Sequence, residues 1–130
     1  MLEVSVEDRR GRVQRLAGRV VRADTRSLRR KGVQGRQDLS PEEGVLLVYP
    51  PRPGIALFYS IHMFGVPFSL VAAWLDKGGV ILEAIQTFPG GFYFPSSIWI
   101  SPRYVLELHP DHLPALREGA QVRWRTAFGE

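Results

Sequence analysis

Residues 68–88 read FSLVAAWLDKGGVILEAIQTF and predict a β-hairpin. Two largely apolar runs, 68–75 and 80–88, flank the turn sequence Asp76-Lys77-Gly78-Gly79. Glycine adopts positive φ angles at no steric cost, and short hairpin turns need such angles. The pattern therefore predicts two adjacent strands in the centre of a sheet.

Short apolar or alternating runs continue on both sides of this hairpin. Glycine or proline bounds most of them, and they cover residues 11–23, 45–49, 55–59, 92–95, 98–100, 104–108 and 121–127. Two short helices interrupt them: one at residues 25–31, with Asp24-Thr25 as its N-cap and Gly32 after it, and one at 112–118. This spacing predicts a mainly β fold, either a jelly-roll-like sandwich or a distorted barrel, with one or two short helices.

Length and composition predict a single globular domain over residues 11–130, with a frayed N-terminus at residues 1–10. The chain has 130 residues, of which 45% are hydrophobic and 23% charged. It has no cysteine, which excludes disulfides, thiolate metal sites and cysteine nucleophiles. The longest apolar stretch, Val66–Leu75, has about half the length of a membrane-spanning helix. We therefore expect a cytoplasmic protein without a membrane partner.

Positive charge is concentrated near the N-terminus. Residues 1–36 hold most of the chain's basic side chains, although the net charge of the whole chain is only +4. Clustered arginines attract phosphates, so a nucleic acid is one candidate partner for this segment. A solvated, arginine-rich surface explains the same charge without any ligand.

Three motifs resemble those of domain of unknown function family 192 (DUF192), a family of uncharacterised bacterial and archaeal proteins. The first runs from Ala23-Asp24-Thr25 to Leu46, the second comprises residues 61–65 and 75–79, and the third is Pro102-Arg103-Tyr104-Val105-Leu106-Glu107-Leu108. They occur in the family's order and spacing over about residues 20–124. The resemblance implies a β-rich, jelly-roll-like sandwich without an established activity. It also implies that Val71 replaces an aspartate of the family's central motif, so a function that needs this aspartate is lost here.

Charged side chains on or near apolar strands are the first candidates for a ligand-binding site. Glu107 shares one face of its strand with Arg103, and it can meet a ligand, Arg103, or an arginine such as Arg29. An unpaired buried carboxylate costs several kcal/mol, so a structural ion pair that holds the short helix against the sheet is the favoured interpretation. His62 precedes the hairpin, where we expect a half-buried side chain that hydrogen-bonds a backbone carbonyl.

Aromatic residues close to Gly90-Gly91 form another candidate surface. Tyr93 and Trp99, with Phe92 and Phe94, are of the type that stacks on sugars or bases, although they can equally fill a small core. His109-Pro110-Asp111-His112 has the donor atoms of a metal site but too few ligands, and a solvated turn is the interpretation that we adopt. No metal or other cofactor is predicted.

These features favour a non-enzymatic ligand-binding or accessory domain that recognises a small molecule, a sugar-like ligand or a protein. One alternative is a hydrolase-like enzyme whose site is assembled in space from His62 and Glu107, with Asp76 and Glu83 as the remaining titratable candidates. Another is a nucleic-acid-associated protein that uses the N-terminal arginines. The sequence contains no catalytic motif that decides among them.

Overall fold

The computed structural model describes residues 1–51, 59–96 and 102–127. Within these ranges the strands are β1 Leu2–Glu7, β2 Val13–Ala23, β3 Glu43–Val48, β4 Ile61–His62, β5 Val71–Leu75, β6 Ile81–Gln86, β7 Phe92–Tyr93, β8 Tyr104–Leu108 and β9 Gln121–Thr126. The helices are α1, Arg26–Lys31, and a 3₁₀ helix, η2, Pro110–Ala115. The predicted mainly β fold with two short helices is confirmed.

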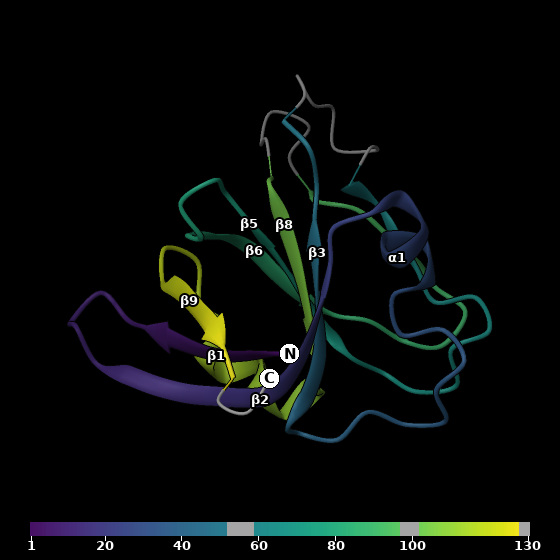
Figure 1. Ribbon diagram of the computed structural model, residues 1–130, viewed down its shortest axis with the longest axis horizontal. Helices are drawn as coiled ribbons and strands as arrows, with labels where there is room; N and C mark the ends of the chain where they lie inside the picture. The colour runs from purple at the N-terminus through teal and green to yellow at the C-terminus, as the bar shows by residue number, and fades with distance from the viewer. Residues whose placement is uncertain (52–58, 97–101, 128–130) are drawn as a thin grey trace.

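Seven of the strands in the described ranges form one curled sheet, in the order β6-β5-β8-β3-β2-β1-β9 (Figure 1). Its two edges meet at one end, where Val80 forms an isolated bridge with Gln121 and Ile81 donates a hydrogen bond to the Ala120 carbonyl. The sheet therefore curves into a half-barrel. The predicted hairpin at residues 68–88 forms β5 and β6 of this sheet.

The pairing of β2 with β3 is parallel, whereas the other neighbours in the sheet pair antiparallel. Parallel neighbours need a crossover connection, because the chain must return to the end at which the first strand began. Residues 24–42 make this connection and include α1. Figure 1 shows α1 beside β3, on the side away from the curled β1–β2–β9 end.

The predicted frayed N-terminus at residues 1–10 is wrong for β1. This strand lies between β2 and β9 and pairs with both. Leu2, Val4 and Val6 alternate with partly exposed residues and are buried in the core inside the curl. The alternation of side chains along a strand thus explains why the first residues are ordered by packing.

Two hydrophobic clusters lie on the two faces of the central strands. Alternation sends Leu46 of β3 and Leu106 of β8 into the cluster inside the curl, and sends Val45, Leu47 and Val105 to the opposite face. On that opposite face the core is completed by residues from the crossover and from the segment around β4. Trp74 is buried there, and its indole N–H donates to the Tyr59 carbonyl at 2.9 Å.

The predicted helix at residues 25–31 forms as α1. Thr25 Oγ1 accepts the N–H of Leu28 at 3.1 Å, and Gly32 adopts a φ of 46° after the last turn. The second predicted helix lies two residues earlier than expected, at Pro110–Ala115, because Pro110 opens it. The strands predicted at residues 55–59 and 98–100 lie largely outside the described residues.

No helix in the described part of the chain is both long and apolar enough to cross a membrane.

The pairing of β3 with β8 predicts a clear effect of substituting Gly44. A Cβ atom at this position would lie 2.5 Å from both the Glu107 carbonyl oxygen and Leu108 Cδ2. We expect Gly44→Ala to lower the free energy of unfolding by about 1–3 kcal/mol, as measured by urea denaturation. Gly78→Ala is the control, because its Cβ would meet Asp76 Oδ1 at 3.4 Å, and its effect should stay within about 0.5 kcal/mol. Equal stability of the two variants would contradict the close packing of β3 on β8.

Candidate functional site

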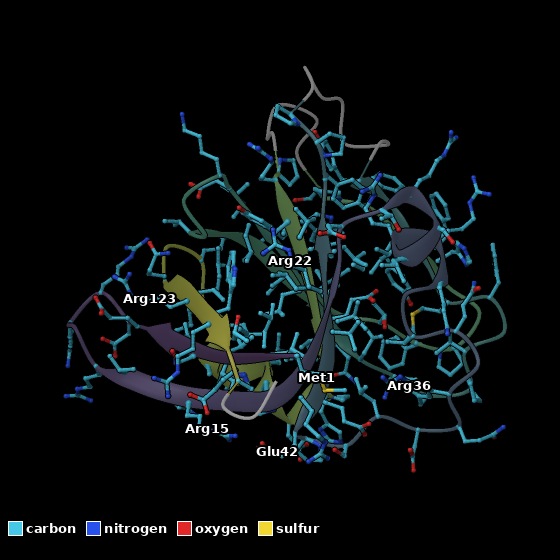
Figure 2. The ribbon with its side chains drawn as sticks, viewed as in Figure 1. Met1, Arg15, Arg22, Arg36, Glu42 and Arg123 are labelled. Atoms are coloured by element: carbon cyan, nitrogen blue, oxygen red, sulfur yellow. The ribbon has the colours of Figure 1, made fainter. Side chains whose placement is uncertain are left out.

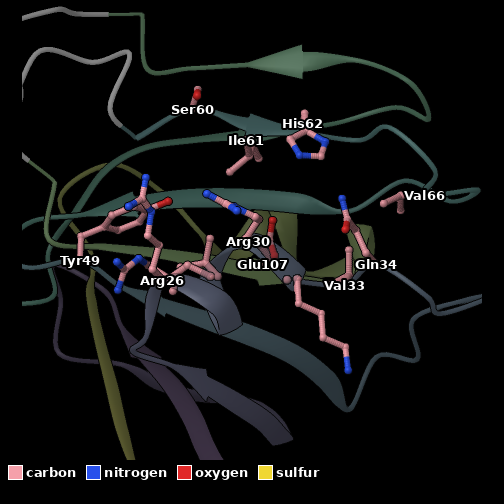
Figure 3. A pocket seen from close by; sticks show the side chains of 14 residues that line it. Arg26, Arg30, Val33, Gln34, Tyr49, Ser60, Ile61, His62, Val66 and Glu107 are labelled. Carbon is pink, nitrogen blue, oxygen red and sulfur yellow. The ribbon is translucent and has the colours of Figure 1, made fainter.

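A pocket of about 650 Å³ lies between α1 on one side and the segment around β4 on the other. We call it the α1 pocket. In Figure 3, Ser60, Ile61 and His62 lie on one side of the pocket, opposite Arg26, Arg30 and Glu107. Its lining combines cations, neutral polar groups, apolar side chains and a single carboxyl group: Arg26, Arg29, Arg30, Lys31, Gly32, Val33, Gln34, Leu47, Tyr49, Ser60, Ile61, His62, Val66 and Glu107.

Glu107 is the buried charged group of this pocket. It lies on β8 between Val45 of β3 and Ala72 of β5, its partners in the two neighbouring ladders. The residue is 5% exposed, and its Oε1 atom has no hydrogen-bond partner within the described residues. A Cβ atom on Gly32 would lie 3.3 Å from this oxygen, so the glycine lets the end of α1 approach the carboxyl group closely.

Burial of Glu107 among apolar neighbours raises the pKa of its carboxyl group to about 7. Loss of solvation disfavours the charged form of a carboxyl group, and this is the cause of the shift. At neutral pH the group therefore exists in both protonation states. It can donate a hydrogen bond through its proton or accept hydrogen bonds as a carboxylate.

The predicted structural ion pair of Glu107 with Arg103 or Arg29 is wrong. The Arg29 guanidinium donates to the Val48 carbonyl at 2.9 Å, and its central carbon lies 5.2 Å from the centre of the Tyr49 ring. Arg103 Nε donates to the Tyr49 carbonyl at 2.9 Å. Both cations are thus directed to carbonyl groups at the end of β3. Arg29 still lines the α1 pocket. Arg103 does not line it, and instead hydrogen-bonds the carbonyl of Tyr49, which does.

Three other cations line the pocket on α1, and we call them the cation wall: Arg26, Arg30 and Lys31. No acidic residue in the described ranges forms an ion pair with any of them. Arg26 and Arg30 are four residues apart and so share one face of the helix. These cations are visible in the sequence, but favourable interaction with the helix dipole accounts for cations in the last turn of a helix without any ligand, so they do not by themselves indicate a binding site.

The opposite side of the pocket is formed by β4 and the residues next to it, and β4 pairs with β7. His62 is exposed, contrary to the expected half-buried side chain, and its ring stacks on Phe64 with centroids 5.1 Å apart. Tyr93 pairs with Ile61, and its hydroxyl accepts the N–H of Phe88 at 2.9 Å. Tyr93 therefore has a structural partner and does not line the pocket. Trp99 lies outside the described residues.

The remaining titratable candidates are scattered. Asp76 Oδ1 accepts the N–H groups of Gly78 and Val80 in the β5–β6 turn, and Glu83 accepts hydrogen bonds from Ser96. Of the four groups considered for an enzyme, only His62 and Glu107 share a pocket.

The histidines of the predicted turn at residues 109–112 have structural partners. His109 Nδ1 accepts the N–H of Asp111 at 3.1 Å, and His112 Nε2 lies 2.7 Å from the Pro41 carbonyl. The described residues contain no cluster of three potential metal ligands. These side chains begin η2 and attach it to the crossover.

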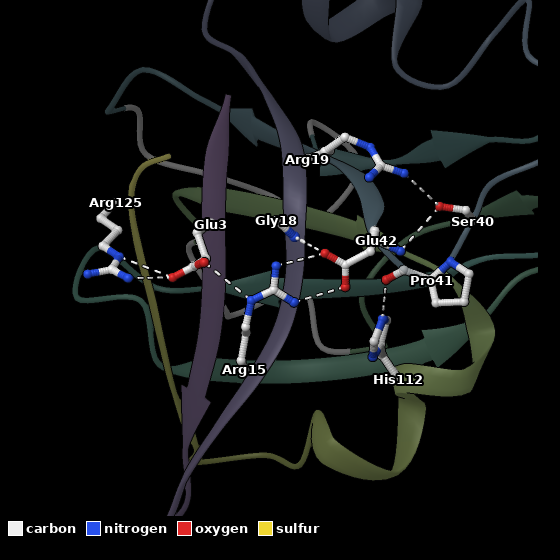
Figure 4. Close-up of polar contacts among 9 residues, drawn as sticks. All are labelled: Glu3, Arg15, Gly18, Arg19, Ser40, Pro41, Glu42, His112 and Arg125. Carbon is white, nitrogen blue, oxygen red and sulfur yellow. Dashed lines mark hydrogen bonds and ion pairs between the residues drawn. The ribbon is translucent and has the colours of Figure 1, made fainter. Parts of the chain in front are cut away.

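Several arginines of the basic N-terminal segment are neutralised by acids (Figures 2 and 4). Arg15 binds Glu42 through two hydrogen bonds of 2.7 and 2.9 Å and also contacts Glu3, which binds Arg125. Hydrogen bonds from Arg125 and Arg15 lower the pKa of Glu3, and Arg15 does the same for Glu42. This network of ion pairs therefore connects β1, β2, β9 and the crossover.

The raised pKa of Glu107 predicts a specific dependence of stability on pH. The folded chain holds this proton up to about pH 7, whereas the unfolded chain loses it near pH 4.5, the ordinary pKa of a glutamate. The free-energy cost of burying the charged form of Glu107 is thus absent below the unfolded pKa. It grows as the pH rises and levels off above the folded pKa, at about 3 kcal/mol.

Glu107→Gln should remove this dependence, because the amide does not titrate. We expect the stability advantage of the variant over the parent chain to increase between about pH 4.5 and 7, as measured by urea denaturation at a series of pH values. Other carboxyl groups contribute equally to both chains and cancel in the difference. Two parallel stability curves would contradict the raised pKa.

Comparison with solved structures shows the fold in two other bacterial proteins. A protein from Sinorhizobium meliloti 1021, described as a "putative transcription regulator", matches with a TM-score of 0.79 and 19% identity, over 95% of this chain and 94% of its own. A protein of unknown function from Novosphingobium aromaticivorans DSM 12444 matches with a TM-score of 0.75 and 19% identity, over 94% of this chain and 84% of its own. At this identity the likeness concerns the fold alone.

No curated protein matches the chain significantly. The family described as DUF192, Uncharacterized ACR, matches residues 6–124, nearly the whole chain. This match confirms the resemblance seen in the three sequence motifs, and no specific function is established for the family or for either structural neighbour. The chain belongs to the DUF192 family.

Proposed function

We propose that this chain is a non-enzymatic ligand-binding domain, and that its α1 pocket holds a small, negatively charged molecule. The observation that carries the proposal is the Oε1 atom of Glu107, which is buried in the pocket without a hydrogen-bond partner in the described residues. A buried polar atom of this kind costs about 1–3 kcal/mol. A ligand that donates a hydrogen bond to it recovers that cost, so the pocket favours such a ligand.

The charge of the pocket lining supports an anionic ligand. The cation wall and Arg29 contribute positive charge, whereas Glu107 is the single acid in the lining and is partly protonated at neutral pH. Guanidinium groups bind carboxylates and phosphates through paired hydrogen bonds. The expected ligand therefore has an anionic group near Arg26 and Arg30, and a hydroxyl or amino group that reaches Glu107.

Thermal denaturation with a panel of probes tests this proposal. The probes are inorganic phosphate, citrate, glucose 6-phosphate and AMP, with glucose as the uncharged comparison. A probe at a hundred times its Kd should stabilise the fold by about 2.7 kcal/mol, which raises Tm by several degrees. Glucose should have no effect. An unchanged Tm with every anionic probe at millimolar concentration would contradict the proposal.

Substitutions locate the binding site of an active probe. Arg30→Ala should weaken binding about tenfold or more, because it removes a charge-assisted hydrogen bond, and Glu107→Leu should also weaken it, because leucine lacks the hydrogen-bond acceptor. Arg123→Ala is the matched control, since Arg123 is exposed on β9 and pairs loosely with Glu7 at 3.8 Å. Equal losses in Arg30→Ala and Arg123→Ala would show that the probe responds to net charge and not to the pocket.

One observation favours a second candidate, a hydrolase-like acid–base site. His62 and Glu107 line the same pocket, and burial brings the pKa of the carboxyl group to about 7, where proton transfer at neutral pH is efficient. If this candidate is correct, p-nitrophenyl acetate or phosphate should be hydrolysed, and both Glu107→Gln and His62→Ala should abolish turnover. Hydrolysis that persists in both variants would exclude it.

A further inference from the structure

Exposed aromatic side chains continue from the mouth of the α1 pocket across the β4–β7 sheet. We call them the aromatic strip: His62, Phe64, Phe92 and Phe94. The three phenylalanines are 57%, 50% and 47% exposed, respectively. Contiguous exposed apolar groups on a folded protein commonly mark a binding surface.

Contacts within the strip connect it to the pocket. His62 lines the pocket and stacks on Phe64 at 25° between the ring planes. Phe92 is opposite His62 in the antiparallel ladder, so the two side chains share one face of the small sheet. The Phe92 and Phe94 rings lie 6.0 Å apart. The strip therefore consists of two ring pairs on one face of the small sheet, joined by the ladder pairing of His62 with Phe92, and it begins at the pocket.

His62, the first residue of the aromatic strip, lines the α1 pocket on the side opposite the cation wall, and Phe64, Phe92 and Phe94 extend the strip beyond the pocket lining. Residues 26–31 and His62 are far apart in the sequence, and Figure 3 shows Arg26 and Arg30 on one side of the pocket with His62 on the other. A positively charged groove beside aromatic side chains is the surface that binds single-stranded nucleic acids, because cations follow the phosphates while bases stack on the rings.

We propose that the ligand of the α1 pocket is a short segment of single-stranded nucleic acid, an inference that rests on the function proposed above. Phosphates lie along Arg26, Arg30 and Lys31, and bases stack on the rings of the aromatic strip. Glu107 accepts a hydrogen bond from the exocyclic amino group of a base that enters the pocket, as carboxylates do with cytosine. The paired arginines of the curled β1–β2–β9 end take no part.

Fluorescence anisotropy with a short, fluorescein-labelled single-stranded oligonucleotide tests the inference. The double variant Arg26→Ala/Arg30→Ala should weaken binding more than tenfold. It should also make the slope of log K against log salt shallower by about 1.4, because each phosphate contact on a single strand contributes about 0.7. The control double variant Arg10→Ala/Arg12→Ala removes the same charge from the β1–β2 turn, and it should retain the binding and most of the slope.

Aromatic substitutions test the stacking surface separately. Phe64→Ala and Phe94→Ala should each weaken binding about tenfold, which is within the range of base stacking. Phe88→Ala is their control, because Phe88 is 56% exposed and belongs to no ring contact of the strip. Circular dichroism and Tm of each variant verify that it is folded.

The outcomes separate this inference from the proposed function. Equal losses in the two arginine pairs, or undiminished binding by the Phe64 and Phe94 variants, would overturn the inference. A free mononucleotide that binds as tightly as the oligonucleotide would also overturn it, since the strip would then contribute nothing. If small anions bind and the oligonucleotide does not, the inference fails while the proposed function stands; if neither binds, both fail.

Discussion

The parallel pairing of β2 with β3 is the constraint on which the candidate site depends. Val20 pairs with Gly44 and Ala23 with Leu47, so both strands run in one direction in the middle of a sheet that is otherwise antiparallel. The chain between them must cross one face of the sheet. That crossover carries α1, and the same face of β3 and β8 presents Glu107. The pocket thus follows from the topology and not from a local motif.

The position of Glu107 is explained by the ladders on both sides of β8. Val45 and Ala72 flank it, and the backbone of β3 has already taken Arg29 and Arg103 as hydrogen-bond donors. The carboxyl group therefore stays without a cationic partner, and desolvation raises its pKa. A protein keeps a group with this cost most readily where a ligand recovers it. The cation wall lines the same pocket, and its positive charge is the reason for proposing an anionic ligand.

Most strands of the large sheet were predictable, because each is recognised from a short stretch of sequence in which apolar residues alternate with polar ones or run together. The β5–β6 hairpin followed from Gly78-Gly79, and α1 followed from Thr25 and Gly32. Glu107 was identifiable as a carboxyl group on an apolar strand. Its lack of a partner was not, because Arg29 and Arg103 bind carbonyls whose positions depend on tertiary structure. The pairing of His62 with Phe92 is likewise long-range. The strand β1 was missed because residues near a chain end are usually expected to be frayed, whereas here pairing with β2 and β9 and burial in the core order them.

The central claim is that Glu107 is a buried carboxyl group without a charged partner, available to a ligand. Carbon-13 NMR of the glutamate side-chain carboxyl groups, assigned with Glu107→Gln, measures its titration directly. The account predicts a pKa of about 7 for Glu107 in the free protein, while Glu3 and Glu42 titrate below their usual range. A pKa for Glu107 at or below 4.5, the ordinary value of a glutamate, would show that the group is solvated or paired, and would contradict the account.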